Sequence, residues 1–204
     1  KNLSEYIEIS RGETLGEIGR RLAGRLGFEP VCALVNNKNE DLWFELYHPK
    51  QVEFQPLTTA SATRVYTRSL CMLLYRAVTR CYPGARLRIE HTISGGYYCR
   101  LDGAGTVDES TAETLTAEMR LLVARDLPFE PHECLTADAI EIFRAQGLDD
   151  KVELLETTRE LYTRYYSLDG ICDSYYGALV QSTRWLSVFA LRPYHEGLLL
   201  LGYD

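Results

Sequence analysis

The apolar positions of the first sixty residues predict a small sheet crossed by one helix. Residues 5–10 alternate between polar and apolar side chains, which is the period of a half-buried strand. Thr14 and Glu17 match a capping box, and apolar residues then recur at helical spacing up to Gly27. Three further segments are predicted as short strands, the first followed by the turn-forming residues 36–39: 31–35, 41–46 and 51–54. Together these elements form a β-grasp pattern.

The polar residues 58–61 separate this part from the rest of the chain and are the predicted domain boundary. A long helix is predicted over residues 62–81, because Pro83 and Gly84 stop its pattern. Further helices are predicted over 109–124 and 136–146, the second capped by Thr136, and strands over 85–93, 97–101, 129–134, 162–168, 185–192 and 197–201. The sequence therefore predicts an α+β protein, with a β-grasp domain of residues 1–58 and a larger mixed domain of residues 62–204.

The bulk composition argues against a membrane protein and against a metal site. The 204 residues are 46% hydrophobic with a mean hydropathy of −0.20, and no run approaches the roughly 20 apolar residues that cross a bilayer. The first residues do not match a signal peptide. We therefore expect a cytoplasmic protein without a membrane partner. The cysteines form no CxxC pair and are predicted to be reduced, buried thiols: Cys32, Cys71, Cys81, Cys99, Cys134 and Cys172.

Charge is distributed unevenly around a net value of −7. Residues 55–89 contain no aspartate or glutamate but carry several arginines: Arg64, Arg68, Arg76, Arg80, Arg86 and Arg88. The planar fork of arginine suits phosphate groups. We therefore expect the arginines of the long helix to bind anions such as nucleotide or RNA phosphates: Arg64, Arg68, Arg76 and Arg80. The alternative is a solvated helix face whose arginines pair with acids elsewhere in the fold.

Two sets of motifs resemble known families. Residues 9–15 (Ile-Ser-Arg-Gly-Glu-Thr-Leu) and 33–36 (Ala-Leu-Val-Asn) resemble the two turns of a TGS domain. Residues 68–74, the pair Tyr82-Pro83 and residues 93–98 follow the order and spacing of the H-S-C-A-H-L-L, Y-P and I-E-D-G-F-Y-Y segments of threonyl-tRNA synthetase. Further similar segments lie at 118–119, 126–128, 139–143 and 151–154. The resemblance covers nearly the whole chain and implies a TGS domain followed by an editing-type domain.

The chain departs from this family at the residues that carry the editing chemistry. In the family, two histidines four residues apart face a Cys-x-x-x-His pair in the pocket that hydrolyses mischarged aminoacyl-tRNA, or in a zinc site in the related alanyl branch. The matching helix positions here are Arg68 and Met72. With residues 181–183 (Gln-Ser-Thr) as the family's P-S-T anchor, the second pair falls at Tyr175 and Leu179. None of these side chains replaces imidazole or thiolate as a zinc ligand or proton carrier. The resemblance therefore implies a degenerate editing domain, with no catalytic residue, no metal and no cofactor.

Three functions are compatible with a degenerate editing domain. The same two modules are expected ahead of the catalytic domain in bacterial nucleoside kinases that resemble uridine kinase, and the ending of this chain looks more like that group. Because residues 103–105 form no P-loop, this hypothesis makes the chain a non-catalytic regulatory or ligand-binding region. Its partner would be an ATP- and Mg²⁺-dependent kinase domain beyond Asp204. The alternatives are a tRNA-binding region of a threonyl-tRNA synthetase-like protein without editing activity, and a divergent hydrolase. With a shifted anchor, Cys172 or His195 becomes the displaced editing residue.

Overall fold

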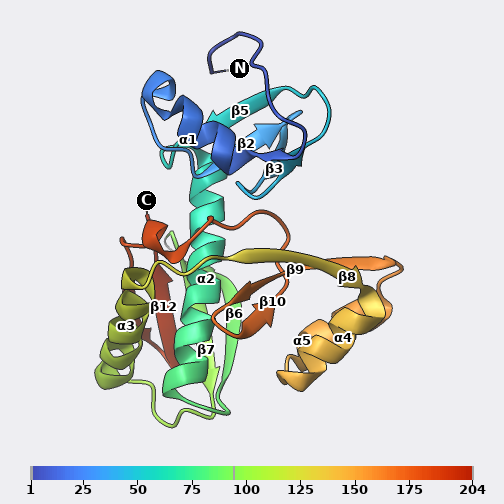
Figure 1. Ribbon diagram of the computed structural model, residues 1–204. Helices are drawn as coiled ribbons and strands as arrows, with labels where there is room; N and C mark the ends of the chain where they lie inside the picture. The colour runs from blue at the N-terminus through green and yellow to red at the C-terminus, as the bar shows by residue number, and fades with distance from the viewer. Residues whose placement is uncertain (1, 94, 204) are drawn as a thin grey trace.

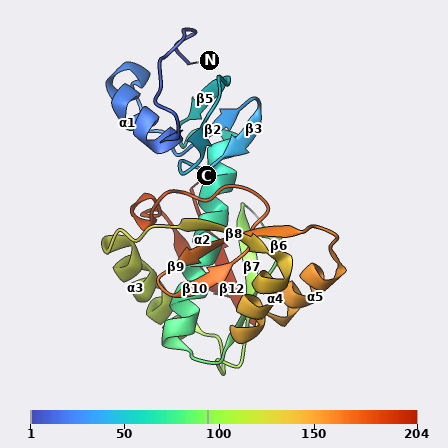
Figure 2. The ribbon, with the colours of Figure 1, turned by 45° about the vertical axis from the view of Figure 1, so that its right-hand side comes forward.

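The computed structural model describes residues 2–93 and 95–203, which form a smaller and a larger lobe joined by one long helix (Figures 1 and 2). Lys1, Asp204 and Ser94, part of the motif at residues 93–98, lie outside the described residues. Helices combine with several small antiparallel sheets, so the predicted α+β class is confirmed. Within the two described ranges, no helix is long and apolar enough to span a membrane.

The helix of the smaller lobe begins and ends where the sequence predicts. α1 (Leu15–Leu26) starts at a capping box, in which the Thr14 hydroxyl accepts from the Glu17 N–H and the Glu17 carboxylate accepts from the Thr14 N–H at 2.8 Å. Gly27 ends the helix in the left-handed conformation, with φ at 74°. The helical spacing places three apolar side chains in the core of the lobe: Leu15, Ile18 and Leu22.

The sheet of the smaller lobe has the order β3 (Lys38–Glu40), β2 (Cys32–Val35) and β5 (Val52–Gln55), and β1 (Glu13–Thr14) pairs separately with β4 (Glu45–Leu46). The predicted turn at 36–39 is shorter than expected, because Asn36 and Asn37, with φ at 49° and 67°, complete it alone. Both residues tolerate the left-handed conformation that a tight hairpin requires. Lys38 therefore already belongs to a strand.

Two strand predictions in this lobe are wrong. Residues 5–10 form no strand, although Ile7 and Ile9 are half-buried against the core of the lobe. The alternating pattern therefore identified the side chains that face the core, but no neighbouring strand pairs with residues 5–10. The predicted strand at 41–46 shrinks to its last two residues, because the Asp41 carboxylate accepts from the Trp43 N–H at 2.9 Å and holds a turn.

The larger lobe is built around α2 (Ala60–Cys81). One sheet has the order β11 (Ala190–Tyr194), β12 (Gly197–Leu201), β7 (Gly96–Asp102), β6 (Arg86–Ile93), and the other has the order β10 (Ile171–Asp173), β9 (Tyr162–Leu168), β8 (Glu130–Leu135). The remaining elements are α3 (Glu109–Ala124), α4 (Thr136–Ala145), α5 (Asp149–Thr157) and the 3₁₀ helix η1 (Thr183–Trp185). Half of the residues of α2 are buried, and they form the centre of the core.

The polar residues 58–61 form the start of α2. The Thr59 hydroxyl accepts from the Ala62 N–H at 3.3 Å, and the helix begins at Ala60, two residues before the predicted start. Thr136 is not the predicted cap of α4, because its hydroxyl donates to the Glu160 carbonyl at 2.7 Å instead. α5 and β10 form in segments whose sequence pattern predicts no element. The strand predicted at 185–192 begins only at Ala190, since η1 precedes it.

The two lobes touch through specific contacts. The Tyr166 hydroxyl on β9 donates to the buried Asp41 carboxylate of the smaller lobe at 2.5 Å. Gly16 on α1 comes so close to the larger lobe that a Cβ atom there would lie 2.9 Å from Gln181 Nε2. Cys32 on β2 packs within the core of the larger lobe rather than that of its own sheet. The junction therefore contains both a buried hydrogen bond and close packing.

Candidate functional site

The four degenerate editing positions lie along the contact between α2 and residues 174–182, which follow β10. Arg68 on α2 donates from Nη1 to the Ala178 carbonyl at 2.6 Å. One residue further along the helix, the buried Ser69 hydroxyl accepts from the Val180 N–H at 2.9 Å. Gly177 is required at this contact, because its φ is 120° and a Cβ atom would lie 2.6 Å from Arg68 Nη1. Helix and segment are thus joined by hydrogen bonds at the positions that the resemblance matches to the editing pocket.

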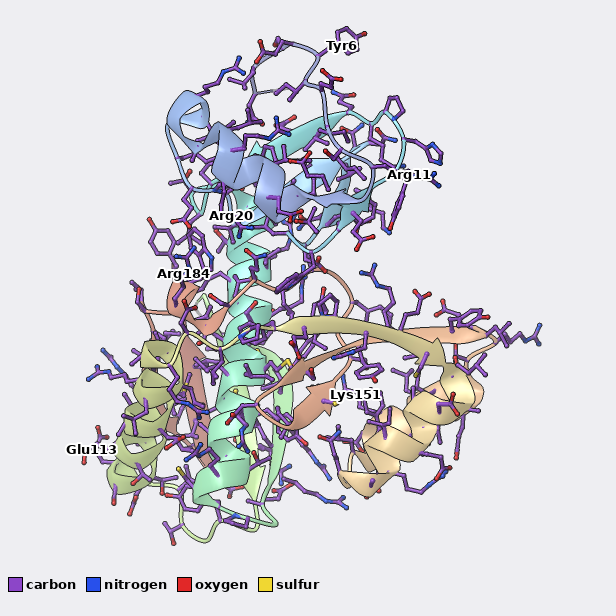
Figure 3. All side chains as sticks on the ribbon, in the orientation of Figure 1. Tyr6, Arg11, Arg20, Glu113, Lys151 and Arg184 are labelled. Atoms are coloured by element: carbon purple, nitrogen blue, oxygen red, sulfur yellow. The ribbon has the colours of Figure 1, made fainter. Side chains whose placement is uncertain are left out.

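Two of the four positions are core residues. Met72 and Leu179 have no exposed surface and belong to the main core of the larger lobe. Tyr175 is half-buried beside this core, and the Lys151 ammonium lies 5.3 Å from its ring centroid; Figure 3 labels Lys151 beside β10. Burial, followed by the nearby Asp173 carboxylate, raises the pKa of Tyr175 well above its ordinary value. The phenol therefore stays protonated at neutral pH.

Arg68 is the only one of the four with a permanent charge, and burial lowers the pKa of its guanidinium from 12.5. The group remains cationic at neutral pH, because arginine starts from so high a pKa. It uses one donor on Ala178 and is half-buried. The arrangement can hold an anion through the remaining donors, but none of the four side chains is a base near neutral pH.

The four arginines of α2 divide into two groups. Arg76 and Arg80 meet the Asp169 carboxylate, with shortest N–O distances of 2.9 Å and 3.6 Å, and Arg125 of α3 joins them at 2.9 Å. Arg80 also pairs with Glu118 at 2.9 Å. Burial of the Asp169 carboxyl would raise its pKa, but the hydrogen bonds from Arg125 and Arg76 outweigh that effect and lower the pKa below 3.8. Acids of other elements therefore already neutralise this group.

Arg64 and Arg68 form the second group. Within residues 2–93 and 95–203, neither takes part in an ion pair; Arg64 is exposed and reaches only the Ser61 hydroxyl, at 3.4 Å. They stand one helical turn apart on α2, so their side chains lie on the same face. Beyond the helix, Arg86 pairs with Asp149, and Arg88 lies 3.6 Å from Asp102.

The cysteines near this contact are protonated thiols rather than thiolates. All six thiols are free, and Cys32, Cys71 and Cys99 are buried. Burial raises the pKa of Cys32 to about 12 and that of Cys71 to about 12, so both stay protonated. His132 on β8 bonds to the Ser167 hydroxyl at 2.7 Å on an exposed part of the sheet. No group of three or more potential metal ligands occurs in the part of the chain that the structure describes.

Sequence reasoning missed Asp169 as the carboxylate that gathers the arginines. Asp169 and Gly170 join β9 to β10, with φ at 46° and 90°. An Asp-Gly pair after an alternating strand is a known hairpin signal, and could have placed this carboxylate in a tight turn. The sequence contains no signal for its contact with α2, 93 residues earlier in the chain.

No family model matches the chain. Curated threonine–tRNA ligases are similar to it over most of its length. The ligase of Carboxydothermus hydrogenoformans is 29% identical over 189 residues, covering 92% of this chain and 30% of the ligase. The ligase of Fusobacterium nucleatum is 29% identical over 178 residues (86% of this chain, 29% of the ligase), and that of Rubrobacter xylanophilus is 26% identical over 186 residues (91% and 29%).

These relatives correct the leading functional prediction. The curated relatives found carry the name of a tRNA ligase, which contradicts the prediction of a region from a uridine kinase-like nucleoside kinase. The expected ATP- and Mg²⁺-dependent kinase partner depended on that prediction and loses its basis with it. The chain spans about 30% of the length of the curated relatives it matches. It is a region similar to threonine–tRNA ligases.

Proposed function

We propose that this chain is a tRNA-contacting region of a threonyl-tRNA synthetase-like protein, acting in the cytoplasm, and that it does not hydrolyse aminoacyl-tRNA. The observation that carries the proposal is the similarity to threonine–tRNA ligases along 92% of the chain. The names of those relatives state that they act on tRNA and threonine, so tRNA is the natural partner to test.

The contact with RNA is assigned to Arg64 and Arg68. A phosphate needs a cation that no carboxylate already neutralises, and the Asp169 cluster occupies Arg76 and Arg80. Arg64 is exposed, and Arg68 lies on the same face of α2 with donors beyond its bond to Ala178. Arg76 and Arg80 therefore support the fold in this proposal rather than the ligand.

Loss of hydrolysis rests on the chemistry of the four positions. General acid and base groups contribute about 10²- to 10⁴-fold each to such reactions, and a guanidinium, a thioether, a phenol of raised pKa and an isobutyl group supply none of this at neutral pH. Met72 and Leu179 also occupy core volume instead of lining an open pocket. A substrate could not reach them without unpacking the lobe.

Fluorescence anisotropy with a labelled tRNA transcript tests the binding half of the proposal. We expect saturable binding at low salt, and a loss of affinity in Arg64→Ala with a decrease of about 1 in the salt slope, as for one lost phosphate contact. The matched control is Arg144→Ala, an exposed arginine of α4 that pairs with Glu141 and Glu156. Equal affinity and slope for both variants and the unaltered chain would show that α2 does not contact the RNA.

A deacylation time course with seryl-tRNA tests the other half. The expected result is no turnover above buffer, together with no stoichiometric zinc by elemental analysis. Turnover that survives dialysis against a chelator would instead support the divergent hydrolase, and a 1:1 zinc content would contradict the reading of the four positions.

We also propose that residues 1–58 and 62–204 are separate domains, the first TGS-like. Each lobe has its own buried apolar cluster, which supports the division. Residues 62–204 expressed alone test it, with boundaries varied from residue 58 to 62 so that the Thr59 cap of α2 is kept in some versions. An unfolded product at every boundary would count against two independent domains.

A further inference from the structure

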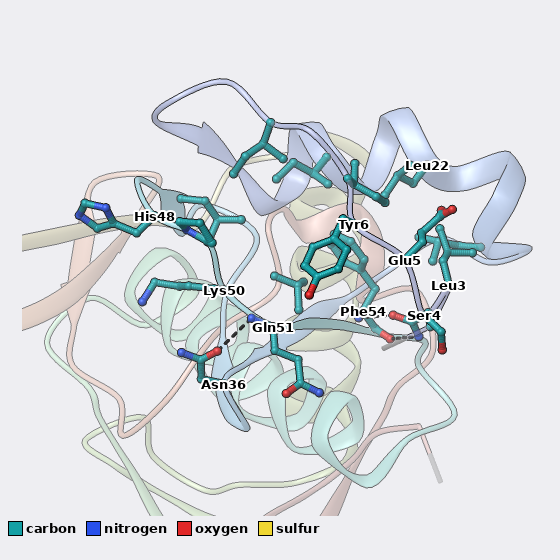
Figure 4. Close-up of a pocket in the computed structure, with 18 of the residues that line it drawn as sticks. Leu3, Ser4, Glu5, Tyr6, Leu22, Asn36, His48, Lys50, Gln51 and Phe54 are labelled. Atoms are coloured by element: carbon teal, nitrogen blue, oxygen red, sulfur yellow. Dashed lines mark hydrogen bonds between the residues drawn. The ribbon is translucent and has the colours of Figure 1, made fainter.

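The smaller lobe contains a cavity of about 930 Å³ that the tRNA proposal does not use. It lies between α1, residues 46–54 and the N-terminal residues 2–11 (Figure 4). Small-molecule sites in proteins have volumes of about 300–1,000 Å³. The cavity is therefore large enough for a compact organic ligand.

One side of the cavity is the apolar core of the lobe. Ile18 and Leu22 come from α1, Leu46 from β4 and Phe54 from β5, and all four are at most 5% exposed. These side chains are fixed by packing against one another. An apolar ligand would remove the remaining apolar surface from water without rearranging the helix or the strands.

The N-terminal segment forms the opposite side and is held by side-chain bonds rather than by a strand. The Asn2 amide donates to the Phe54 carbonyl at 3.0 Å and accepts from the Phe54 N–H at 2.7 Å. Glu5 pairs with Arg25 at the end of α1. Tyr6, which follows Glu5, is fully exposed, and Figure 4 shows it between the two ends of the cavity. These bonds, together with the half-buried side chains of Ile7 and Ile9 packed against the core, hold the segment in place as the second wall of the cavity.

The charges on the lining are separated along the cavity. Figure 4 shows His48 and Lys50 at one end, and Leu3, Leu22 and Glu5 at the other. Arg11 also lines the cavity and stacks 5.9 Å from the Tyr47 ring centroid. Among the ion pairs of the described residues, none involves Arg11 or Lys50, whereas the one lining carboxylate, Glu5, is already neutralised by Arg25.

We propose that this cavity binds an amphipathic organic anion, with its apolar body against Leu22 and Phe54 and its acidic head group at Lys50 and Arg11. The apolar side provides the affinity and the two free cations provide the preference for an anion over a neutral or cationic molecule. The head group is a carboxylate or a phosphate. This inference is independent of tRNA binding, because Arg64 and Arg68 lie on α2 and do not line the cavity.

Titration of the 204-residue chain with 1-anilinonaphthalene-8-sulfonate, an aromatic anion that fluoresces in apolar surroundings, tests the proposal. Saturable 1:1 binding is expected, weakened about five- to tenfold in Arg11→Ala/Lys50→Ala, as for two partly exposed charge contacts. The matched control is Lys38→Ala, an exposed lysine of β3 in the same lobe that pairs with Glu40 and does not line the cavity. Its affinity is expected to stay unchanged.

Competition identifies the head group. Decanoate and adenosine monophosphate represent a fatty carboxylate and an aromatic phosphate, and displacement by either one supports the site and assigns its class. Decylamine has the same chain with a cationic head and is expected to displace at least tenfold less well than decanoate. Leu26→Glu, which places a carboxylate on a half-buried lining position, should also weaken binding. Absence of saturable binding, equal displacement by decylamine, or equal affinity in the double variant and the control would overturn the proposal.

Discussion

The carboxylate of Asp169 is expected to contribute more to stability than any other acid that pairs with the acid-free stretch, and Asp169→Asn tests this. Asn keeps the size of the side chain and tolerates the left-handed φ of 46°, so the substitution removes the charge with little backbone effect. It leaves Arg76, Arg80 and Arg125 without their shared anion.

The size of the effect follows from exposure. The Asp169 side chain is 17% exposed and that of Arg76 is 19% exposed, so their pair is weakly screened. A hydrogen bond to a charged group contributes about 1.5–3 kcal/mol in such surroundings. Arg80 and Arg125 are 42% and 46% exposed, and pairs of this kind contribute at most about 1 kcal/mol each. Since Asn still accepts one hydrogen bond, we expect a net loss of about 2–3 kcal/mol.

Thermal and urea unfolding measure this loss. For a chain of this length, a loss of about 2–3 kcal/mol lowers Tm by about 5–10 °C. The pH dependence gives a second check. Because the pKa of Asp169 is lowered in the fold, its stabilisation is present above the ordinary pKa of 3.8 and disappears as pH falls through the lower folded value. The difference between Asp169→Asn and the unaltered chain should therefore vanish in acid.

Asp149→Asn is the matched control, because Asp149 and its partner Arg86 are 60% and 53% exposed. We expect a change of at most about 0.5 kcal/mol there. If Asp169→Asn costs no more than this control, or if its cost persists in acid, the carboxylate does not organise the arginines as described.

Three further predictions concern the junction and α1. Tyr166→Phe removes the buried hydroxyl that bonds to Asp41 and should cost about 1.5–3 kcal/mol in urea unfolding. Burial raises the pKa of Asp41 above 3.8, so the ionised carboxylate destabilises the folded state once pH rises through the pKa of the folded protein. Asp41→Asn should therefore raise Tm at pH 7 and leave Tm unchanged well below pH 3.8. Gly16→Ala should lower Tm, since its Cβ would lie 2.9 Å from Gln181, whereas Gly24→Ala on the same helix meets open space and should stabilise by about 0.5–1 kcal/mol. Equal Tm changes for the two alanine variants would contradict the close packing at Gly16.

The sequence alone determined the elements whose signals are local. The capping box at Thr14, the helix at 109–124 and the strands at 85–93 and 97–101 appear within one residue of where they were predicted, because caps, helical spacing and strand alternation act within a few positions. The assignment of Arg68, Met72, Tyr175 and Leu179 to the four editing positions comes from the resemblance and stays a prediction. The relatives, rather than the fold, contradicted the kinase prediction.

Tertiary structure decided whatever depends on a distant partner. Residues 5–10 have the alternation of a strand, but no neighbouring strand pairs with them along these residues. The helical arginines look alike in sequence, yet Arg76 is neutralised and Arg64 is not, because the turn at Asp169 reaches one part of α2 and not the other. A carboxylate 93 residues away changes the role of an arginine only after the chain has folded. Charge pairing depends on distance in space, which sequence patterns do not specify.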